Sequence, residues 1–228
     1  MSSERPVSAG VDQPTDRPRR RIRRVATLFY ALLAALLLVL GAETARTALG
    51  SNFHTVVAGR CYRCAQPRAD DLGLLVHALG IRTIVNLRGA EEEPWYEAES
   101  ALAQRLGLHL ADAGMWATHA PTEDEFRRVF HAVDDGPEPV LIHCVSGIDR
   151  TGMASALFLL LKTDATIEQA RGQLSPRFGH NPWGRAACQD RILTSYAMWL
   201  AEHGLRHAPE HLRCWCREGY RQDINARW

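Results

Sequence analysis

The stretch Val140-Leu-Ile-His-Cys-Val-Ser-Gly-Ile-Asp-Arg-Thr-Gly152 decides the fold of this chain. An apolar strand, Pro139 to His143, leads into a short loop that contains Gly147, and Arg150-Thr151 begin a helix that is apolar from Met153 to Leu161. A strand that turns into a helix is typical of sheets whose strands are parallel. We therefore expect an α/β domain built around this unit.

The segments on either side continue the alternation of strands and helices. We expect strands near 55–57, 61–63, 81–87 and 108–111, and helices over 70–79, 94–106, 122–133, 187–203 and 210–222. Capping boxes at Thr122–Glu125 and Thr166–Gln169 open two helices, and Gly80 ends the first one. The predicted fold is a central, mostly parallel sheet flanked by helices.

The loop after the strand is suited to hold an anion. Successive backbone N–H groups turn inward in such a loop, and the N-terminus of the following helix adds positive potential. The same field favours the thiolate of Cys144, which is a nucleophile. Arg150 offers a planar pair of donors that matches phosphoryl oxygens. The predicted phosphate-binding residues are Val145, Ser146, Gly147, Ile148, Asp149 and Arg150.

This stretch resembles a known signature. Its members are His143, Cys144, Gly147, Arg150 and Thr151, and they are similar to the Cys-x5-Arg motif of the cysteine-dependent protein tyrosine and dual-specificity phosphatases. The segment Gly59-Arg-Cys-Tyr-Arg-Cys-Ala-Gln-Pro67 resembles the bacterial dual-specificity-like branch, although a small polar residue commonly stands there in place of Cys64. The resemblance covers about residues 51–200.

The resemblance implies a role for each of these side chains. In the family the cysteine attacks phosphorus and forms a phosphocysteine, the arginine binds phosphate, and the next hydroxyl helps the cysteine leave. These roles fall to Cys144, Arg150 and Thr151, with His143 in support. The implied activity is hydrolysis of phosphomonoesters on a phosphorylated protein, without metal or cofactor. The alternative substrate is a phospholipid or phosphoinositide headgroup, because Asp149 would suit a polyol.

Three other interpretations of the loop stay open. Cys144 could be a buried structural cysteine, but such a residue does not need Gly147 and Arg150 at these spacings. A rhodanese-like sulfur carrier also holds a cysteine in a loop of this size, but His143 and the Thr-Gly pair after Arg150 favour a phosphatase. A binding module without turnover would keep the loop, and the presence of both Cys144 and Arg150 argues against it.

The departing oxygen of a phosphomonoester needs a proton, so we expect a carboxylic acid facing the cysteine. Asp112 is the first candidate, because it follows the predicted strand 108–111 and lies 32 positions before Cys144. That spacing is similar to the spacing in dual-specificity phosphatases. Asp112 could instead only cap a turn. The rival acid is Asp149, inside the loop.

Several side chains near the expected site have two interpretations. Arg88 either points into the cleft or pairs with one of the acidic residues 91–93. Trp95, Tyr96 and Trp116 either line the mouth of the site or pack against the core.

Five cysteines remain besides Cys144. Cys61-x2-Cys64 and Cys214-x-Cys216 could form a four-sulfur zinc site or one or two disulfides, although the second spacing is atypical for zinc. We expect unpaired cysteines or a single bridge.

The N-terminal segment has a membrane-anchor pattern. Residues 1–24 end in Arg17-Pro-Arg-Arg-Arg-Ile-Arg-Arg24, and an apolar run of 18 residues, 25–42, follows. The arginines place the N-terminus in the cytoplasm. We expect a disordered leader over 1–24, a transmembrane anchor over 25–42, a linker over 43–50 and an extracytoplasmic phosphatase domain over 51–228. A cleaved signal peptide and a buried helix are the alternatives.

Composition agrees with a folded domain. The chain has 228 residues, of which 46% are hydrophobic and 23% charged, and this argues against disorder and against a small disulfide scaffold. Its formal net charge of +1 gives no general attraction to nucleic acid, so none is expected as a partner.

Overall fold

The structure is a computed structural model that describes residues 27–38 and 51–222. The chain divides into two units, Met1–Glu43 and Thr44–Trp228. The predicted leader over 1–24, the linker over 43–50 and both ends of the predicted span 25–42 lie outside the described residues.

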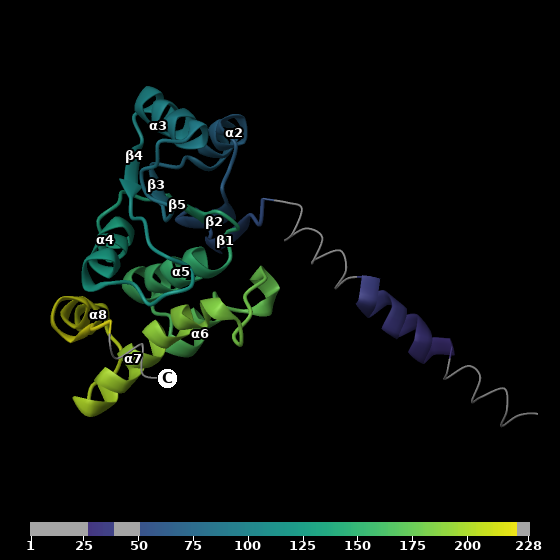
Figure 1. Cartoon of the computed structure of the whole chain (residues 1–228). Helices are drawn as coiled ribbons and strands as arrows, with labels where there is room; N and C mark the ends of the chain where they lie inside the picture. Colours follow the sequence, from purple (N-terminus) through teal and green to yellow (C-terminus); the bar gives the residue numbers. More distant parts are fainter. Residues whose placement is uncertain (1–26, 39–50, 223–228) are drawn as a thin grey trace, which may run out of the picture. The chain divides into compact units, whose positions relative to one another are not determined.

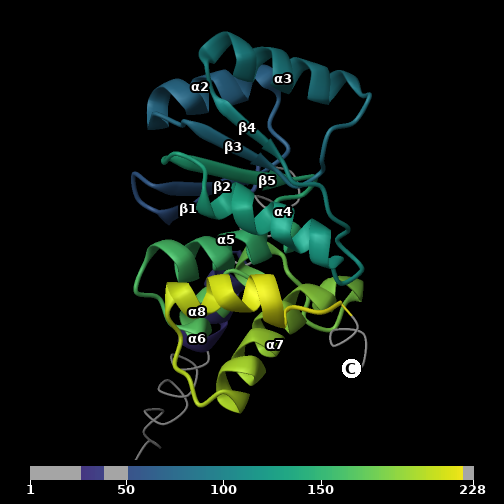
Figure 2. The same cartoon turned by 90° about the vertical axis from the view of Figure 1, so that its left-hand side faces the viewer.

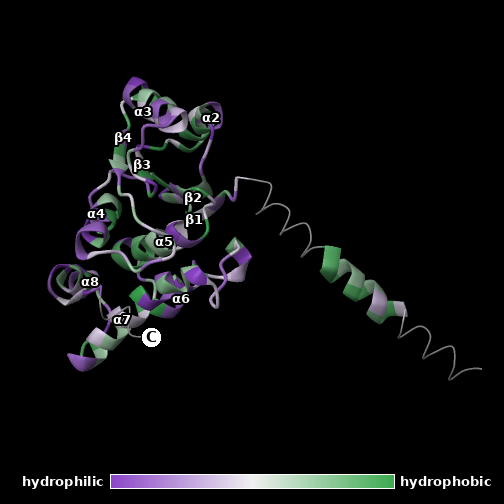
Figure 3. Cartoon of the chain, viewed as in Figure 1, coloured by the Kyte–Doolittle hydropathy of each residue, from purple (hydrophilic) through white to green (hydrophobic). Residues whose placement is uncertain are grey.

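The first unit is described over one helix, residues 27–38. Its leucine, phenylalanine and tyrosine side chains are exposed, and Figure 3 colours this helix mostly as hydrophobic. No helix within the two described stretches is both long enough and apolar enough to cross a membrane.

The second unit is built on a five-stranded sheet (Figure 1). Its strands are β1 (His54–Val57), β2 (Cys61–Ala65), β3 (Thr83–Asn86), β4 (His109–Asp112) and β5 (Val140–Cys144). They lie in the order β1-β2-β5-β3-β4, and every neighbouring pair is parallel except β1 with β2. The prediction of a mostly parallel sheet is confirmed, and β5, the strand that leads to the cysteine, is the central one.

Helices cover both faces of this sheet (Figures 1 and 2). One face carries α2 (Ala69–Leu79) and α3 (Pro94–Leu106). The other carries α4 (Glu123–Asp134), α5 (Asp149–Lys162), α6 (Ile167–Arg171), α7 (Cys188–Glu202) and α8 (Pro209–Cys214). Short helical turns lie at η1 (Pro176–Phe178), η2 (Arg185–Ala187) and η3 (Trp215–Gly219).

The central strand is buried on both faces because its side chains alternate between two cores. Leu141 packs in the core under α2 and α3, whereas Val140 and Ile142 belong to the larger core under α4 to α8. All five residues of β5 are buried, and this explains why that strand is apolar up to His143.

Local signals set the helix ends as expected. Thr122 and Thr166 each form a capping box, and Gly80 ends α2 in the left-handed conformation.

Two of the predicted element boundaries need correction. The strand predicted over 108–111 is shifted by one residue, so Asp112 is the last residue of β4 and pairs in register with Asn86.

The helix predicted over 210–222 was also wrong in part. The α-helix ends at Cys214 and continues as the π-helical turn η3. This wider turn accompanies the burial of Trp215 and Tyr220, whose rings both pack against Phe126 of α4.

Candidate active site

The candidate site lies at the carboxyl end of β5, in the middle of the sheet. Cys144 is the last residue of the strand and is buried, residues 145–148 form the loop, and α5 begins at Asp149. Arg150 and Thr151 therefore stand in the first turn of a helix whose N-terminus faces the loop. Parallel α/β sheets bind their ligands at this edge.

Gly147 fixes how closely the loop approaches the neighbouring strand. Its φ is +69°, and a Cβ built there would lie 2.5 Å from the backbone of Cys64 and Ala65 in β2. A side chain does not fit in this space, and the left-handed backbone also disfavours one. The loop can pack against β2 only with glycine at this position.

The carbonyl groups of the loop are all bound on its outer side. Gln66 N donates to Val145 O at 3.2 Å, and Asn52 Nδ2 donates to the next two carbonyls at 3.2 and 3.1 Å. Arg63 Nη2 donates to Gly147 O at 2.9 Å and to Ile148 O at 3.1 Å. In the described part of the chain, the N–H groups of residues 146–148 have no acceptor. A loop with its carbonyls bound outside and its N–H groups unpaired is an anion-binding cradle.

Arg63 is the strongest of these anchors. Its guanidinium is fully buried on β2, lies 4.0 Å from the ring centre of Phe178, and also donates to Gln173. Burial lowers the pKa of Arg63 to about 10, while nearby acidic groups oppose this shift. Arg63 therefore stays charged at neutral pH and adds positive potential behind the loop.

Arg150 keeps part of its guanidinium available. Nη1 donates to Leu87 O and to Met115 O, both at 3.1 Å, so the loops after β3 and β4 hold the side chain in place. Its Nε is buried and has no acceptor among the described residues. The hydroxyl of Thr151 is likewise buried without a partner in the described chain. Both groups have donors available for a phosphoryl group or for the cysteine sulfur.

His143 points away from the loop, into the face covered by α3. Its Nε2 lies 3.2 Å from Glu99 Oε1, and both side chains are buried. Gln66 donates to the other oxygen of Glu99 at 2.9 Å. Because Gln66 N also binds the loop, this chain of contacts links α3 and β2 to the residue before Cys144.

Asp112 is held by two neutral donors. Tyr96 donates its hydroxyl to Oδ2 at 2.5 Å and Asn86 donates to Oδ1 at 2.8 Å. The hydrogen bond to Asp112 raises the pKa of Tyr96 to about 12. Asp112 stands at the register level of His143, two strands away, and not on a separate loop.

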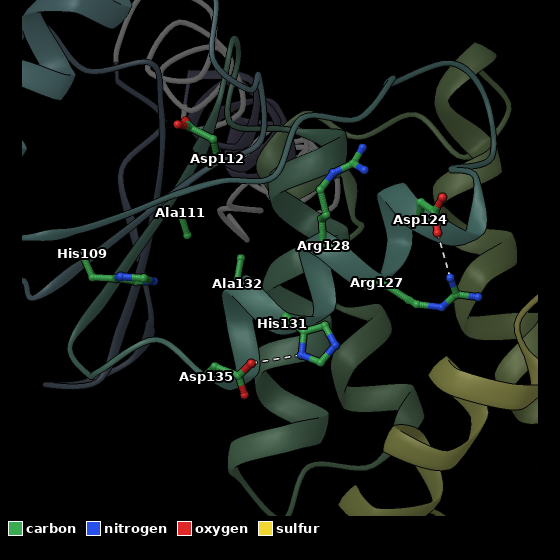
Figure 4. Close-up of a pocket in the computed structure, with 9 residues that line it drawn as sticks. All are labelled: His109, Ala111, Asp112, Asp124, Arg127, Arg128, His131, Ala132 and Asp135. Carbon is green, nitrogen blue, oxygen red and sulfur yellow. Dashed lines mark hydrogen bonds and ion pairs between the residues drawn. The ribbon is translucent and has the colours of Figure 1, made fainter.

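A surface groove of about 590 Å³ lies between β4 and α4, and Asp112 is one of the residues that line it (Figure 4). It is lined by His109, Ala111, Asp112, Asp124, Arg127, Arg128, His131, Ala132 and Asp135. The carboxylate of Asp112 is directed away from His131 and Asp135 in this view.

Asp149 is held by a cation. His180 Nδ1 lies 2.6 Å from Asp149 Oδ1, and its Nε2 lies 2.7 Å from Asp190 Oδ2. The rival acid is therefore engaged in an ion pair within the protein.

Arg88 and the aromatic residues near the site were each given two interpretations, a place in the cleft or a contact with other residues. Arg88 pairs with Glu91 at 3.0 Å and stacks 3.6 Å from the ring centre of Trp95. Tyr96 is bound to Asp112. Trp116 is 67% exposed, and it follows Met115, whose carbonyl accepts a hydrogen bond from Arg150.

All six cysteines are free thiols, so the expected alternative of a disulfide is not found. Cys61 and Cys216 belong to one core and Cys64 to the other, on the opposite face of the sheet. No group of three or more potential metal ligands occurs in the described ranges.

Several residues of the site were missed by sequence reasoning. Asn52, Arg63, Glu99 and His180 reach the site across 95, 84, 44 and 31 positions of sequence. The one available signal was Arg63, because a charged residue inside a short buried strand needs partners.

Comparison with known proteins agrees with this geometry. A profile of the tyrosine phosphatase family matches residues 45–166, more than half of the chain. No curated protein matches the chain.

Two solved structures with a TM-score of 0.50 illustrate the shared fold, and a third structure is reported beside them. The catalytic core of the PP-IP phosphatase SIW14 from S. cerevisiae is 21% identical with a TM-score of 0.50, over 67% of this chain and 93% of that one. A putative phosphatase from Shewanella putrefaciens is 15% identical with a TM-score of 0.50, over 66% and 96%. TpbA from P. aeruginosa is 21% identical with a TM-score of 0.47, over 63% and 83%.

The cradle between Cys144 and Arg150, together with the family match, places the chain in the class of cysteine-based phosphatases. Within that class, the profile match assigns the chain to one family. This chain belongs to the tyrosine phosphatase family, and it is a hydrolase of phosphoric monoesters.

Proposed function

We propose that the chain hydrolyses phosphomonoesters through a phosphocysteine on Cys144. The observation that carries this proposal is the outward binding of the loop carbonyls, which leaves the N–H groups of residues 146–148 unpaired within the described chain. The thiolate attacks phosphorus, and the bond between phosphorus and the ester oxygen breaks. The loop N–H groups and Arg150 stabilise the phosphoryl oxygens during this step.

The second step releases phosphate. Water attacks phosphorus, the phosphorus–sulfur bond breaks, and Cys144 leaves as a thiolate. Thr151 donates to that sulfur from its buried hydroxyl, which has no partner among the described residues. The proton of the attacking water goes to the carboxylate that protonated the ester oxygen in the first step.

Asp112 is the proposed proton donor. Its partners Tyr96 and Asn86 are neutral, so protonation of the carboxyl breaks no ion pair. Protonation of Asp149 would disrupt its pairing with His180.

The proposed substrate is a phosphorylated protein. The cradle itself recognises only a phosphoryl group, so a phospholipid headgroup is the alternative outcome of the substrate panel described below. No metal or cofactor takes part in the proposed steps.

Membrane anchoring by residues 25–42 is part of the proposal, with residues 51–228 outside the cytoplasmic membrane. The arginine run before residue 25 and the exposed apolar side chains over 27–38 support it. Protease added to the outside of intact spheroplasts should then cut the phosphatase domain. Protection of that domain until the membrane is lysed would contradict this orientation.

Turnover by the full-length chain tests the proposed activity. We expect wild type to hydrolyse an activated aryl phosphate, and Cys144→Ser to lose roughly 10⁴-fold or more while still binding vanadate. Cys188→Ser is the matched control, because Cys188 is also a buried free thiol but lies outside the loop. A panel of phosphotyrosine peptides and phosphoinositide vesicles then separates the two substrate classes. Near-normal activity of Cys144→Ser would refute the mechanism.

A further inference from the structure

A buried histidine lies between two carboxylates beside the phosphate loop. His180 is 2% exposed, and its two ring nitrogens lie 2.6 Å from Asp149 and 2.7 Å from Asp190. Asp149 is the first residue of α5 and immediately precedes Arg150, whereas Asp190 lies in α7. The histidine therefore connects the start of α5 to α7.

Both contacts require a proton on the ring nitrogen, because an ionised carboxylate only accepts hydrogen bonds. A neutral imidazole has one N–H, so it can satisfy one of the two carboxylates. Burial lowers the pKa of His180, but the hydrogen bonds to Asp149 and Asp190 outweigh burial and raise the pKa to about 9. His180 is thus an imidazolium at neutral pH.

The charges around this group explain why the imidazolium matters. Asp149 stands at the N-terminus of α5, where its negative charge opposes a bound phosphate dianion. Arg63 from β2 is a second buried cation near Asp149, but its Nη1 donates to Gln173 and its Nη2 donates to loop carbonyls. The thiol of Cys188 on α7 also lies near Asp149, and burial raises its pKa, so it adds no charge at neutral pH.

The segment that carries His180 is also tied to the loop through the side chains of Asn52 and Arg63. Asn52, which binds two loop carbonyls, also donates to Phe178 O at 3.1 Å, and the Phe178 ring packs against Arg63. Three residues after His180, Trp183 is 91% exposed. His180 is therefore a fixed charge, held by a segment that packs directly on the cradle.

We propose that His180 is a positioning residue for phosphate binding, which acts by cancelling the charge of Asp149 beside the cradle and by tying residues 176–187 to it. This inference rests on the proposed phosphatase function. Asp149 then acts as the partner of His180 in an internal ion pair. The affinity of the cradle for an anion then depends on the protonation of His180, which lies outside the cradle.

The test measures tungstate binding by calorimetry, and the KM for an aryl phosphate, with the full-length chain. His180→Gln should weaken tungstate binding and raise KM by about 10-fold, because the Asp149 carboxylate becomes an uncompensated like charge. The double variant His180→Gln with Asp149→Asn should recover to within about twofold of Asp149→Asn alone. His131→Gln is the matched control, since His131 pairs with Asp135 at 3.0 Å on the exposed face of α4.

A second variant serves if His180→Gln does not fold. Asp190→Asn removes one carboxylate from the imidazolium, so the pH above which KM rises should move down from about 9, and Asp149→Asn should abolish that rise. An Asp190→Asn profile identical to wild type overturns the inference, as does a His180→Gln defect that Asp149→Asn does not relieve. If wild type itself binds no tungstate and turns over no aryl phosphate, the proposed function fails and this inference fails with it. Equal tungstate binding by wild type and folded His180→Gln overturns the inference alone.

Discussion

The phosphate loop and the two candidate acids are held in different ways. Each loop carbonyl is fixed from outside by a donor on Asn52, Arg63 or Gln66, so the geometry of the cradle depends on several donors that bind its backbone carbonyls. Each acid depends on one or two side chains: Asp112 is held by neutral donors and Asp149 by a buried cation. Anion binding thus uses backbone N–H groups that several donors hold in place together, whereas proton transfer depends on one carboxyl and its one or two partners.

Destroying the loop should have the largest effect. Gly147→Ala places a Cβ 2.5 Å from the β2 backbone at a φ of +69°, which should cost about 2–6 kcal/mol of stability and abolish both turnover and vanadate binding. Gly80→Ala is the control, because Gly80 has a φ of +65° with nothing within 4 Å of the added atom. It should lose some stability and keep its activity. Normal turnover by Gly147→Ala would show that the close approach to β2 is not required.

Removing the proposed proton donor should have the next largest effect. Asp112→Asn should slow hydrolysis of a phosphotyrosine peptide by roughly 10²- to 10⁴-fold and slow an activated aryl phosphate much less, because a good leaving group departs without a proton. Asp149→Asn should show no such dependence on the leaving group. Asp124→Asn, in the same groove as Asp112, is the control. If the dependence appears in Asp149→Asn and not in Asp112→Asn, the acid lies in the loop.

Removing the buried donor Arg63, which binds two loop carbonyls, should reduce activity less than the loss of the proton donor does. Arg63→Met leaves two loop carbonyls without their buried donor, and we expect kcat/KM to fall roughly 10- to 100-fold. Arg60→Met is matched in chemistry, but Arg60 pairs with Glu138 in a partly exposed ion pair, so its loss should change little. Steady-state kinetics of the two variants would measure the difference. Equal losses would mean that Arg63 acts through general stability only.

The smallest expected effect is on the pH dependence of stability, through the protonation of His180. The pKa of His180 is about 9 in the folded chain and near 6.5 when unfolded, so its stabilisation is present below pH 6.5 and is lost as pH rises through 9. The unfolding temperature of wild type should therefore fall more between pH 6.5 and 9 than that of His180→Gln. Burial also raises the pKa of thiols such as Cys216 to about 12, but that contribution is the same in both proteins. Parallel curves would contradict the ion pair.

Short sequence patterns predicted the features of the fold that depend only on neighbouring residues. The two capping boxes, the glycine end of α2 and the apolar strand before Cys144 each depend on neighbouring residues, and all are found as expected. The mostly parallel sheet followed from the alternation of such elements. The β4 boundary was missed by one residue because Asp112 is polar and yet pairs with Asn86 inside the sheet.

The contacts that hold the site could not be predicted in this way. Asn52, Glu99 and His180 reach the site only after the chain has folded, across tens of residues, and each looks like an ordinary surface residue in the sequence. The spacing from Cys144 to Arg150 encodes the cradle itself. It does not encode the side chains that bind its outer surface, because several different donors could satisfy the same carbonyls.

The most direct test of the account is to detect the phosphocysteine. Thr151→Ala removes the hydroxyl proposed to assist departure of the sulfur, so the intermediate should accumulate during turnover of a labelled phosphotyrosine peptide. Rapid acid quenching followed by peptide mass spectrometry should place the phosphoryl group on Cys144, at a higher level in Thr151→Ala than in wild type. Turnover with no phosphoryl group on Cys144 in either protein, or with the group on another residue, would contradict the account.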